Sequence, residues 1–300
     1  MKILILGSKG FIGSHLRLYL LQSGFDVWGA DVSVDYGLKN YIVVDPSNAD
    51  FNSIFKSNNF DCCVNCSGAA NVSESVTNPK RDYYLNTKLV FDILEAIRIE
   101  APQCKFIQLN SAAVYGNPQT MPVTENIEIK PISPYGWHKY QSELLCKEYS
   151  EIYKIQTVIL RIFSVYGPGL KKQFFWDLYQ KCIANKSFEL FGTGNESRDF
   201  IYIDDLVEAI KLIMPKNNLF AEVFNIASGI EITIKEAAEI FVKNLKEKHS
   251  IFFNNMIRKG DPLNWCADIS KLSSLGFKCS TTIEQGIENY IQWLKSIEEK

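Results

Sequence analysis

Short apolar runs alternate with stretches of helical spacing along the first half of the chain. The runs cover residues 3–6, 27–30, 41–44, 62–66, 105–110 and 156–162, and apolar side chains recur every three or four positions within residues 11–24, 51–57, 82–99 and 134–153. A run that is apolar throughout is typical of a strand buried on both faces, as in a parallel sheet. The alternation therefore predicts an α/β fold built on a doubly wound parallel sheet.

The pattern is looser after Gly167-Pro168-Gly169. Helical spacing covers residues 174–185, 204–214, 234–245 and 283–297, with short strand-like runs at 188–191 and 200–202. We expect a first domain over residues 1–166 and a second, smaller, mixed α/β domain over residues 167–300. Part of the second domain is expected to return to the edge of the first sheet.

Composition and charge exclude several classes of protein. The 300 residues include 46% hydrophobic and 22% charged residues, and the net charge is −2, as in ordinary globular enzymes. Neither nucleic-acid binding nor membrane binding is indicated, because no basic block and no long apolar run is present. The start of the chain has no signal-peptide pattern, so we expect a cytoplasmic protein. The eight cysteines are interpreted as reduced apolar residues, and Cys63-Val64-Asn65-Cys66 lacks the second pair that a metal site needs.

A glycine-rich segment follows the first apolar run and opens the first helix. Glycines at positions 7, 10 and 13 allow a tight turn and a close approach of backbone to a ligand, and the helix N-terminus directs N–H groups at anionic oxygens. This pattern is typical of a dinucleotide-binding loop, although a plain strand-to-helix turn also favours glycine. The residues expected at the cofactor are Gly7, Gly10, Phe11, Ile12 and Gly13.

Two aspartates end the next strands of the predicted sheet. Asp31 follows the second strand, 18 residues after Gly13, where a carboxylate can accept hydrogen bonds from an adenosine ribose and repel a 2′-phosphate. We therefore predict NAD rather than NADP. Asp45 follows the third strand and could reach the adenine amine. Either residue could instead only form a turn.

Tyr135 and Lys139 are four residues apart in a predicted helix and so lie on one face, one turn from each other. A free tyrosine has a pKa of about 10, and a nearby ammonium favours the phenolate. The pair therefore predicts a tyrosine with a lowered pKa that serves as a general acid or base. The same spacing also occurs on solvated helix faces, so its weight depends on the other motifs.

In combination, these motifs resemble those of the extended short-chain dehydrogenase/reductase family, which has a Rossmann fold and includes NAD-dependent nucleotide-sugar epimerases and dehydratases. The resemblance covers essentially the whole chain. Besides the glycine loop it includes Ser67 to Val76, Asn86, Ser111-Ala112-Ala113-Val114-Tyr115-Gly116, Ser133-Pro134-Tyr135 with Lys139, Leu160 to Gly169 and Arg198 to Asp205. The segment Ser67 to Val76 is most similar to that of UDP-hexose 4-epimerases.

The resemblance implies a role for each matching residue. Tyr135 would be the acid or base for a sugar hydroxyl, Lys139 would lower its pKa and bind the nicotinamide ribose, and Ser111 would hydrogen-bond the same sugar oxygen. The expected cofactor residues also include Ser67, Gly68, Ala69 and Asn86. The expected substrate residues are Ser111, Ser164, Arg198 and Arg258. Residues 1–166 would bind the dinucleotide and residues 167–300 the nucleotide sugar.

Departures from the family's motifs reduce the number of activities that we expect for this chain. Ala112 and Ala113 stand where 4,6-dehydratases carry an Asp-Glu pair, so dehydration is not expected. Ala70 replaces a lysine that hexose 4-epimerases often have, and Ser164 replaces the usual asparagine. The leading hypothesis is an NAD-dependent nucleotide-sugar 4-epimerase that acts through a transient 4-keto sugar. A nucleotide-sugar 4-ketoreductase and a non-catalytic NAD- or nucleotide-sugar-binding protein are the alternatives. The resemblance also implies a homodimer. No metal is expected, since neither a second Cys pair nor a His cluster accompanies Cys63 and Cys66.

Overall fold

A seven-stranded, wholly parallel sheet forms the larger part of the molecule. The computed structural model describes residues 1–256, 260 and 262–298. The strand order is β10-β6-β5-β4-β1-β2-β3. The strands are β1 (Lys2–Leu6), β2 (Asp26–Asp31), β3 (Tyr41–Val43), β4 (Cys62–Asn65), β5 (Lys105–Ser111), β6 (Thr157–Ile162) and β10 (Glu222–Ile226). This confirms the predicted doubly wound parallel sheet, and the order reverses direction at β1 and β4.

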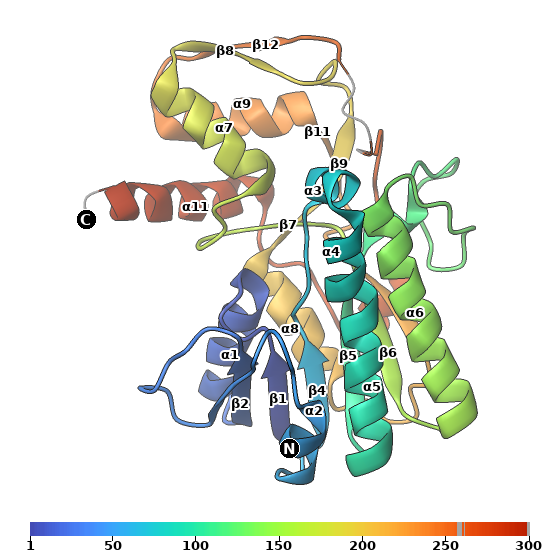
Figure 1. Ribbon diagram of the computed structural model, residues 1–300. Helices are drawn as coiled ribbons and strands as arrows, with labels where there is room; N and C mark the ends of the chain where they lie inside the picture. The colour runs from blue at the N-terminus through green and yellow to red at the C-terminus, as the bar shows by residue number, and fades with distance from the viewer. Residues whose placement is uncertain (257–259, 261, 299–300) are drawn as a thin grey trace.

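Helices cover both faces of this sheet (Figure 1). One face carries α2 (Phe51–Lys56), α5 (Leu89–Glu100) and α6 (Pro134–Tyr153), and the other carries α1 (Phe11–Gln22) and α8 (Ile203–Ile213). The strands β4 and β6 are fully buried because they are covered on both sides. This double cover explains why the strand segments read as continuous apolar runs.

The segment predicted as one helix over residues 82–99 consists of three pieces. The helix α4 (Pro79–Tyr83) leads into a π-helical turn, η1 (Tyr84–Lys88), which continues as α5. A short helix that was not predicted, α3 (Val72–Thr77), precedes them. Asn71 caps α3 and Asn78 caps α4, since each side chain accepts a hydrogen bond from a backbone N–H in the first turn. These capping residues start new helices at positions where the apolar pattern alone gives no sign of a helix boundary.

A smaller layered part lies beyond the carboxyl ends of the parallel strands (Figure 1). The helices α7 (Gln173–Ala184), α9 (Ile234–Leu245) and α11 (Ile283–Glu298) pack there with two small sheets. One sheet has the order β11-β9-β7 and the other pairs β12 with β8. Their bounds are β7 (Ser164–Tyr166), β8 (Ser187–Leu190), β9 (Ser197–Tyr202), β11 (Glu231–Thr233) and β12 (Ser250–Phe253), and the remaining helices are η2 (Ala112–Tyr115) and α10 (Ser270–Ser273).

One hydrophobic cluster extends from the parallel sheet into the smaller part. It includes Ile5 of β1, Leu160 of β6, Phe175 of α7 and Phe241 of α9. Strand β10 and helix α8 also come from the later half of the chain and pack in the larger part. The two parts are therefore held by a shared core, and the space between them is bordered by firmly packed elements on both sides.

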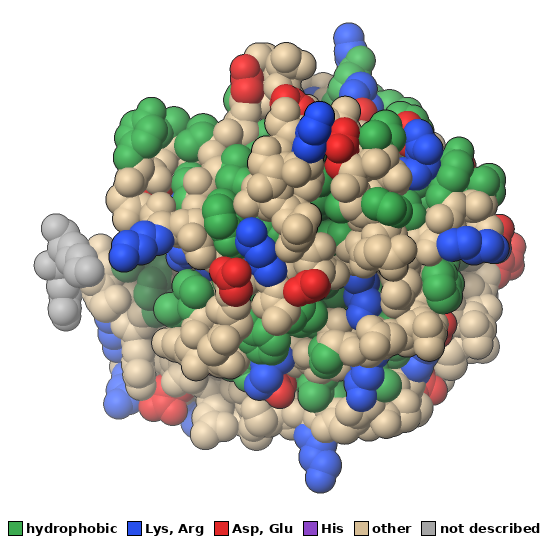
Figure 2. Space-filling view, turned by 90° about the horizontal axis from the view of Figure 1, so that it is seen from below, with side chains coloured by type: hydrophobic (Ala, Val, Ile, Leu, Met, Phe, Trp, Pro, Cys, Tyr) green, Lys and Arg blue, Asp and Glu red, His purple; other side chains and the backbone are tan. Residues whose placement is uncertain are grey.

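On the face seen in Figure 2, lysine, arginine, aspartate and glutamate side chains are interspersed among apolar and polar ones. This distribution agrees with the near-balance of charge in the sequence. Among the described residues, no helix is long and apolar enough to cross a membrane.

Candidate active site

The N-terminus of α6 positions Tyr135 firmly. Ser133 caps the helix by accepting a hydrogen bond from the Gly136 N–H at 3.1 Å, and Pro134 occupies the first helical position. The Tyr135 N–H donates to the Ser75 hydroxyl at 3.1 Å. Gly136 is required by the close packing of α6 on η2, because a Cβ there would lie 2.6 Å from the Ala113 carbonyl oxygen.

Ser111, Tyr135 and Lys139 come together at one cavity, which has a volume of about 660 Å³. Ser111 is the last residue of β5, and Lys139 lies one helical turn after Tyr135 on α6. The Lys139 ammonium donates to the Leu109 carbonyl at 3.1 Å and lies 5.9 Å from the centre of the Tyr135 ring. The three side chains predicted for catalysis thus border a single space.

Burial dominates the electrostatics of this group. It raises the pKa of Tyr135 to about 12, against a smaller opposing effect of the Ser111 hydrogen bond. It also lowers the pKa of Lys139 to about 8. The prediction that Lys139 lowers the pKa of Tyr135 is therefore wrong for this structure. The ammonium lies 5.9 Å from the ring centre and donates to a carbonyl, whereas burial and the charge of Asp82 both raise the pKa of Tyr135.

The glycine loop brings β1, α1 and the end of β4 into contact. Gly7 has a φ of +73°, and a Cβ there would lie 2.8 Å from the Ser67 nitrogen. A Cβ on Gly13 would lie 2.2 Å from the Gly7 carbonyl oxygen. Gly10 caps α1 without a side chain, which leaves the first N–H groups of α1 uncovered by any capping side chain. Such an end suits an anionic group.

The described residues fit a dinucleotide. The side-chain oxygens of Ser8, in the glycine loop, and Asn110, at the cavity, are buried, and neither has a hydrogen-bond partner among the described residues. Ile12 of α1 and the segment Ser67–Ala69 line the same cavity. A dinucleotide could therefore bind to the unpaired polar atoms and lie close to the backbone at Gly7 and Gly13, where no side chain intervenes.

The two strand-end aspartates differ in their surroundings. Asp31 ends β2 and accepts hydrogen bonds from the N–H groups of Lys9 at 2.9 Å and Ser33 at 3.1 Å, so it lies directly against the glycine loop. Asp45 accepts from the N–H and the hydroxyl of Ser47, and these bonds lower its pKa. The Asp45 carboxylate thus forms a turn, and its predicted contact with the adenine stays a prediction.

Asn86 lies behind the cavity rather than on its wall. It is buried, and its side-chain oxygen accepts a hydrogen bond from the Ala69 N–H at 3.2 Å. A Cβ on Gly68, whose φ is +116°, would lie 2.7 Å from that oxygen. Asn86 therefore supports the loop that borders the cavity.

On the side of the smaller part, Ser164 and Arg198 line the cavity. The Arg198 guanidinium donates to the carbonyls of Ser197 and Leu263 at 2.8 and 3.1 Å and lies 5.8 Å from the centre of the Trp265 ring. The predicted substrate residue Arg258 lies outside the described residues.

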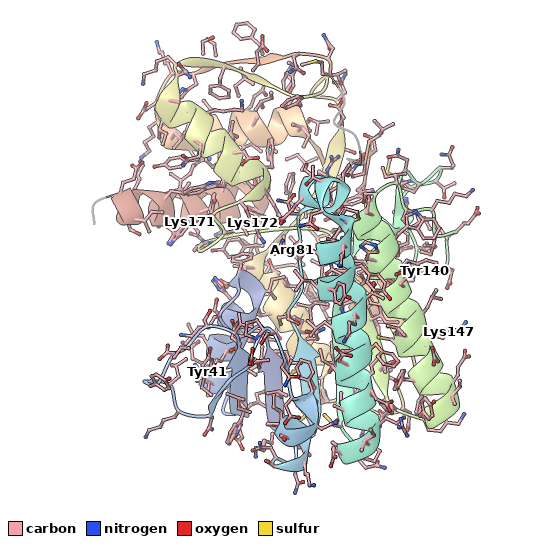
Figure 3. The ribbon with its side chains drawn as sticks, in the orientation of Figure 1. Tyr41, Arg81, Tyr140, Lys147, Lys171 and Lys172 are labelled. Carbon is pink, nitrogen blue, oxygen red and sulfur yellow. The ribbon has the colours of Figure 1, made fainter. Side chains whose placement is uncertain are left out.

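The sequence did not indicate several residues that the structure places at the site. Lys172 and Lys181 line the cavity, and Lys171 and Lys172 lie on the loop between β7 and α7 (Figure 3). Lys172 lies in a loop and Lys181 in the last turn of α7, and neither is part of a motif that the sequence analysis used. Asp82 of α4, which is buried, and His138 of α6, which is half-buried, form a hydrogen-bonded pair behind Tyr135. Within the described part of the chain, no group of three or more His, Cys, Asp or Glu residues is placed to hold a metal ion.

Comparisons with known proteins agree with this geometry. The family model described as "NAD dependent epimerase/dehydratase family" matches residues 3–227. A putative UDP-glucose 4-epimerase of Methanocaldococcus jannaschii is 31% identical, over 98% of this chain and 98% of its own length. An uncharacterized UDP-glucose epimerase of Bacillus subtilis, YtcB, is 32% identical over 99% of both chains.

Solved structures show the same similarity over almost the whole chain. The UDP-glucuronic acid 4-epimerase of Bacillus cereus, in complex with UDP-glucuronic acid and NAD, superposes with a TM-score of 0.90 at 28% identity, covering 99% of this chain and 100% of that one. A UDP-glucose 4-epimerase of Thermotoga maritima, with UDP-glucose, gives a TM-score of 0.89 at 27% identity with the same coverage.

Proposed function

This chain belongs to the NAD-dependent epimerase/dehydratase family, and we propose that it is a nucleotide-sugar 4-epimerase acting through a transient 4-keto sugar. It is an NAD-dependent enzyme of the extended short-chain dehydrogenase/reductase type, and its relatives and structural neighbours include several UDP-sugar 4-epimerases. The observation that carries the proposal is the joint placement of Ser111, Tyr135 and Lys139 on the wall of one cavity that the glycine loop adjoins.

Each of the three side chains has a separate role in the transfer of one proton. Tyr135 takes the proton of the sugar 4-hydroxyl and later returns it, while Ser111 holds the same oxygen by a hydrogen bond. Lys139 holds the nicotinamide ribose. When bound, NAD supplies reversible hydride chemistry and a positive ring charge, which opposes the burial that keeps Tyr135 protonated. General acid–base catalysis of this kind typically contributes ~10²–10⁴-fold to a rate.

The remaining contacts hold the ligands. The first N–H groups of α1 and the glycines at positions 7, 10 and 13, with Phe11 and Ile12 beside them, would bind the pyrophosphate of NAD. Asp31 would accept hydrogen bonds from the adenosine ribose, and the loop Ser67–Ala69 would border the nicotinamide. Arg198, Lys172 and Arg258 would bind the diphosphate of the nucleotide sugar, since arginine can bond two of its oxygens together.

The test is direct. The purified protein is incubated separately with UDP-glucose, UDP-N-acetylglucosamine and UDP-glucuronic acid, and the sugars are analysed by NMR. We expect the 4-epimer of at least one of them to form without net consumption of a nicotinamide cofactor. Failure to form any 4-epimer across the pH range where the protein is folded would refute the proposal.

One observation favours the alternative of a 4-ketoreductase. Ala70 lines the cavity at a position where hexose 4-epimerases often carry lysine. A reductase would use the same three side chains but release oxidised cofactor in each turnover. Rapid consumption of NAD(P)H with a 4-keto-6-deoxy nucleotide sugar would favour the reductase. NAD retained through purification would favour the epimerase.

We also propose that the chain forms a homodimer through α5 and α6. Large apolar side chains are exposed on both helices, including Phe91 (43%) on α5 and Leu144 (46%) on α6. The two helices pack side by side and form one outer face of the molecule (Figure 1), so a second copy could cover both together. Light scattering of the wild type and of Leu144→Glu tests this, since the added charge should favour the monomer.

A further inference from the structure

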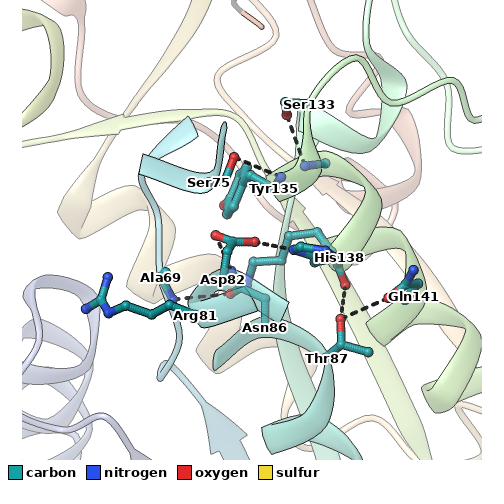
Figure 4. A network of polar contacts seen from close by, with 12 residues as sticks. Ala69, Ser75, Arg81, Asp82, Asn86, Thr87, Ser133, Tyr135, His138 and Gln141 are labelled. Carbon is teal, nitrogen blue, oxygen red and sulfur yellow. Dashed lines mark hydrogen bonds and ion pairs between the residues drawn. The ribbon is translucent and has the colours of Figure 1, made fainter. Parts of the chain in front are cut away.

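A buried carboxylate lies directly behind the catalytic helix. Asp82 of α4 is 3% exposed, and its two oxygens accept hydrogen bonds from His138 Nδ1 at 2.6 Å and Asn86 Nδ2 at 3.1 Å. Figure 4 shows this carboxylate between the Tyr135 side chain and the Asn86 amide. A buried charge persists only when its hydrogen bonds and its electrostatic surroundings compensate it. The position of Asp82 is therefore specified closely by the elements around it.

The hydrogen bonds of Asp82 continue to the wall of the cavity. Asn86, which Asp82 orients, accepts from the Ala69 N–H at 3.2 Å and so fixes the loop Ser67–Ala69. Asn86 lies within the π-helical turn η1, which interrupts an otherwise α-helical segment. Single π-turns occur frequently at functional sites because they turn a side chain out of α-helical register. The π-helical turn therefore lies at the residue, Asn86, that connects Asp82 to the loop Ser67–Ala69.

Two carboxylates act on the charge of Lys139, and they differ in how far they are already neutralised. Glu143 forms a two-pronged ion pair with the buried guanidinium of Arg161, at 2.9 and 2.7 Å. Among the described residues, the Asp82 carboxylate accepts hydrogen bonds from the His138 ring and the neutral Asn86 amide, and neither partner is a lysine or an arginine. Of the two, Asp82 has the larger effect on Lys139, and Glu143 is already paired with a guanidinium.

We propose that Asp82, held in place by His138 and Asn86, is a positioning residue that preserves the positive charge of Lys139 and fixes the loop Ser67–Ala69. This rests on the proposed function only in that it takes Lys139 as part of the catalytic site. Asp82 is the largest influence that opposes the effect of burial on Lys139, and the same charge helps to keep Tyr135 protonated. A single carboxylate thereby influences both members of the catalytic pair.

Other titratable groups near Asp82 and Lys139 either act on Lys139 more weakly than Asp82 does or are already paired with an opposite charge. Arg81 of α4 forms an exposed ion pair with Glu74 of α3, and Tyr83 contacts the His138 ring edge-on at 5.6 Å between ring centres. Cys66 after β4 acts on Lys139 less than Asp82 does. Besides Asp82, the titratable groups that act on Lys139 are Cys66 and Glu143, and the charge of Asp82 also acts on Tyr135.

The first experiment measures Lys139 itself, without any sugar. The folded full-length chain is acetylated at a series of pH values and then digested, and mass spectrometry of the peptide that contains Lys139 gives the midpoint at which the amine loses its proton. In the wild type we expect a midpoint near the pKa of about 8. In Asp82→Asn we expect a fall of about one pH unit or more, the usual size of a close charge effect. Asp92→Asn, which removes an exposed carboxylate paired with Lys88, is the matched control and should not move the midpoint.

Two substitutions of His138 test whether its hydrogen bond holds the Asp82 carboxylate in place. They also provide a test if Asp82→Asn fails to fold. The glutamine side chain of His138→Gln can still donate a hydrogen bond to Asp82, so we expect a midpoint close to that of the wild type. His138→Leu removes the donor and should lower the midpoint and weaken NAD binding through the loosened loop. Isothermal titration with NAD measures the second effect.

Some outcomes would overturn the proposal. It is wrong if the Lys139 midpoint in Asp82→Asn equals that of the wild type, or if Asp92→Asn lowers it equally. It is also wrong if His138→Gln and His138→Leu behave alike in both assays. Because neither assay contains a sugar, an inactive protein with the expected midpoints would refute the 4-epimerase and leave the role of Asp82 intact.

Discussion

Replacing Lys139 by methionine should stabilise the protein while removing its activity. Burial lowers the pKa of Lys139 from 10.5 to about 8, which corresponds to a cost of about 3 kcal/mol for holding the charged amine in the folded state. Methionine has a similar length and no charge to desolvate. The lost hydrogen bond to the Leu109 carbonyl costs about 1 kcal/mol, and that carbonyl still accepts from the Gln108 side chain at 3.0 Å. The expected gain is therefore about 2 kcal/mol near neutral pH.

The gain should depend on pH in a defined direction. Because the folded-state pKa of Lys139 is lowered, the unfolded chain binds more protons than the folded one between about pH 8 and 10.5. The cost of the charged amine is fully present below about pH 8 and disappears as the pH rises through this window. The stability difference between Lys139→Met and the wild type should shrink accordingly.

Urea unfolding of both proteins, without NAD, at about pH 7 and about pH 10 measures this difference. The account requires the variant to be more stable at the lower pH and the two free energies of unfolding to converge at the higher pH. A variant that is equally or less stable near pH 7, while its m-value is unchanged, would show that Lys139 does not carry a buried charge. The reasoning on its burial would then fail.

Three further substitutions test other parts of the site. Tyr135→Phe should lower turnover by ~10²–10⁴-fold in steady-state assays with little change in NAD affinity; retention of wild-type turnover would exclude Tyr135 as the acid–base group. Arg161→Met should lower the free energy of unfolding by about 3–5 kcal/mol in urea, because it leaves Glu143 as a buried charge without its guanidinium. Lys147→Met, in an exposed ion pair, should change it by less than about 1 kcal/mol, and equal losses would contradict this reasoning. Gly13→Ala should abolish NAD binding in titration calorimetry, since its Cβ would lie 2.2 Å from the Gly7 carbonyl oxygen; unchanged affinity would count against NAD binding at the glycine loop.

The sequence predicted the parallel sheet because burial on both faces leaves a strong signal. Strands such as Cys62–Asn65 have no exposed residue, so every position is free to be apolar. The glycine predicted to follow the first strand, Gly7, also has a clear physical cause. Its positive φ and its close contact with Ser67 exclude a side chain. The predicted grouping of Ser111 with Tyr135 and Lys139 followed from the family resemblance, and the structure places all three at one cavity.

The sequence could not predict features that depend on partners distant along the chain. The error at Tyr135 arose because spacing shows that a lysine is near but not how deeply both groups are buried. The apolar pattern places Asp82 at the start of a predicted helix and gives no sign of its bond to His138, which joins residues 56 positions apart. The return of part of the later chain to the sheet edge was expected, but the sequence did not identify residues 222–226 as the strand that pairs with β6. The domain boundary at residue 166 stays a prediction.

The central claim is that a sugar carbinol is oxidised and reduced at C4 within a single active site. The most direct measurement uses a UDP-hexose that carries deuterium at C4, with the product analysed by NMR and mass spectrometry. The account predicts a C4 epimer that keeps its deuterium, because the hydrogen removed from C4 is the one returned. A 4-epimer that has lost this deuterium to solvent, or a protein that releases a C4-reduced sugar only while consuming NAD(P)H, would contradict it.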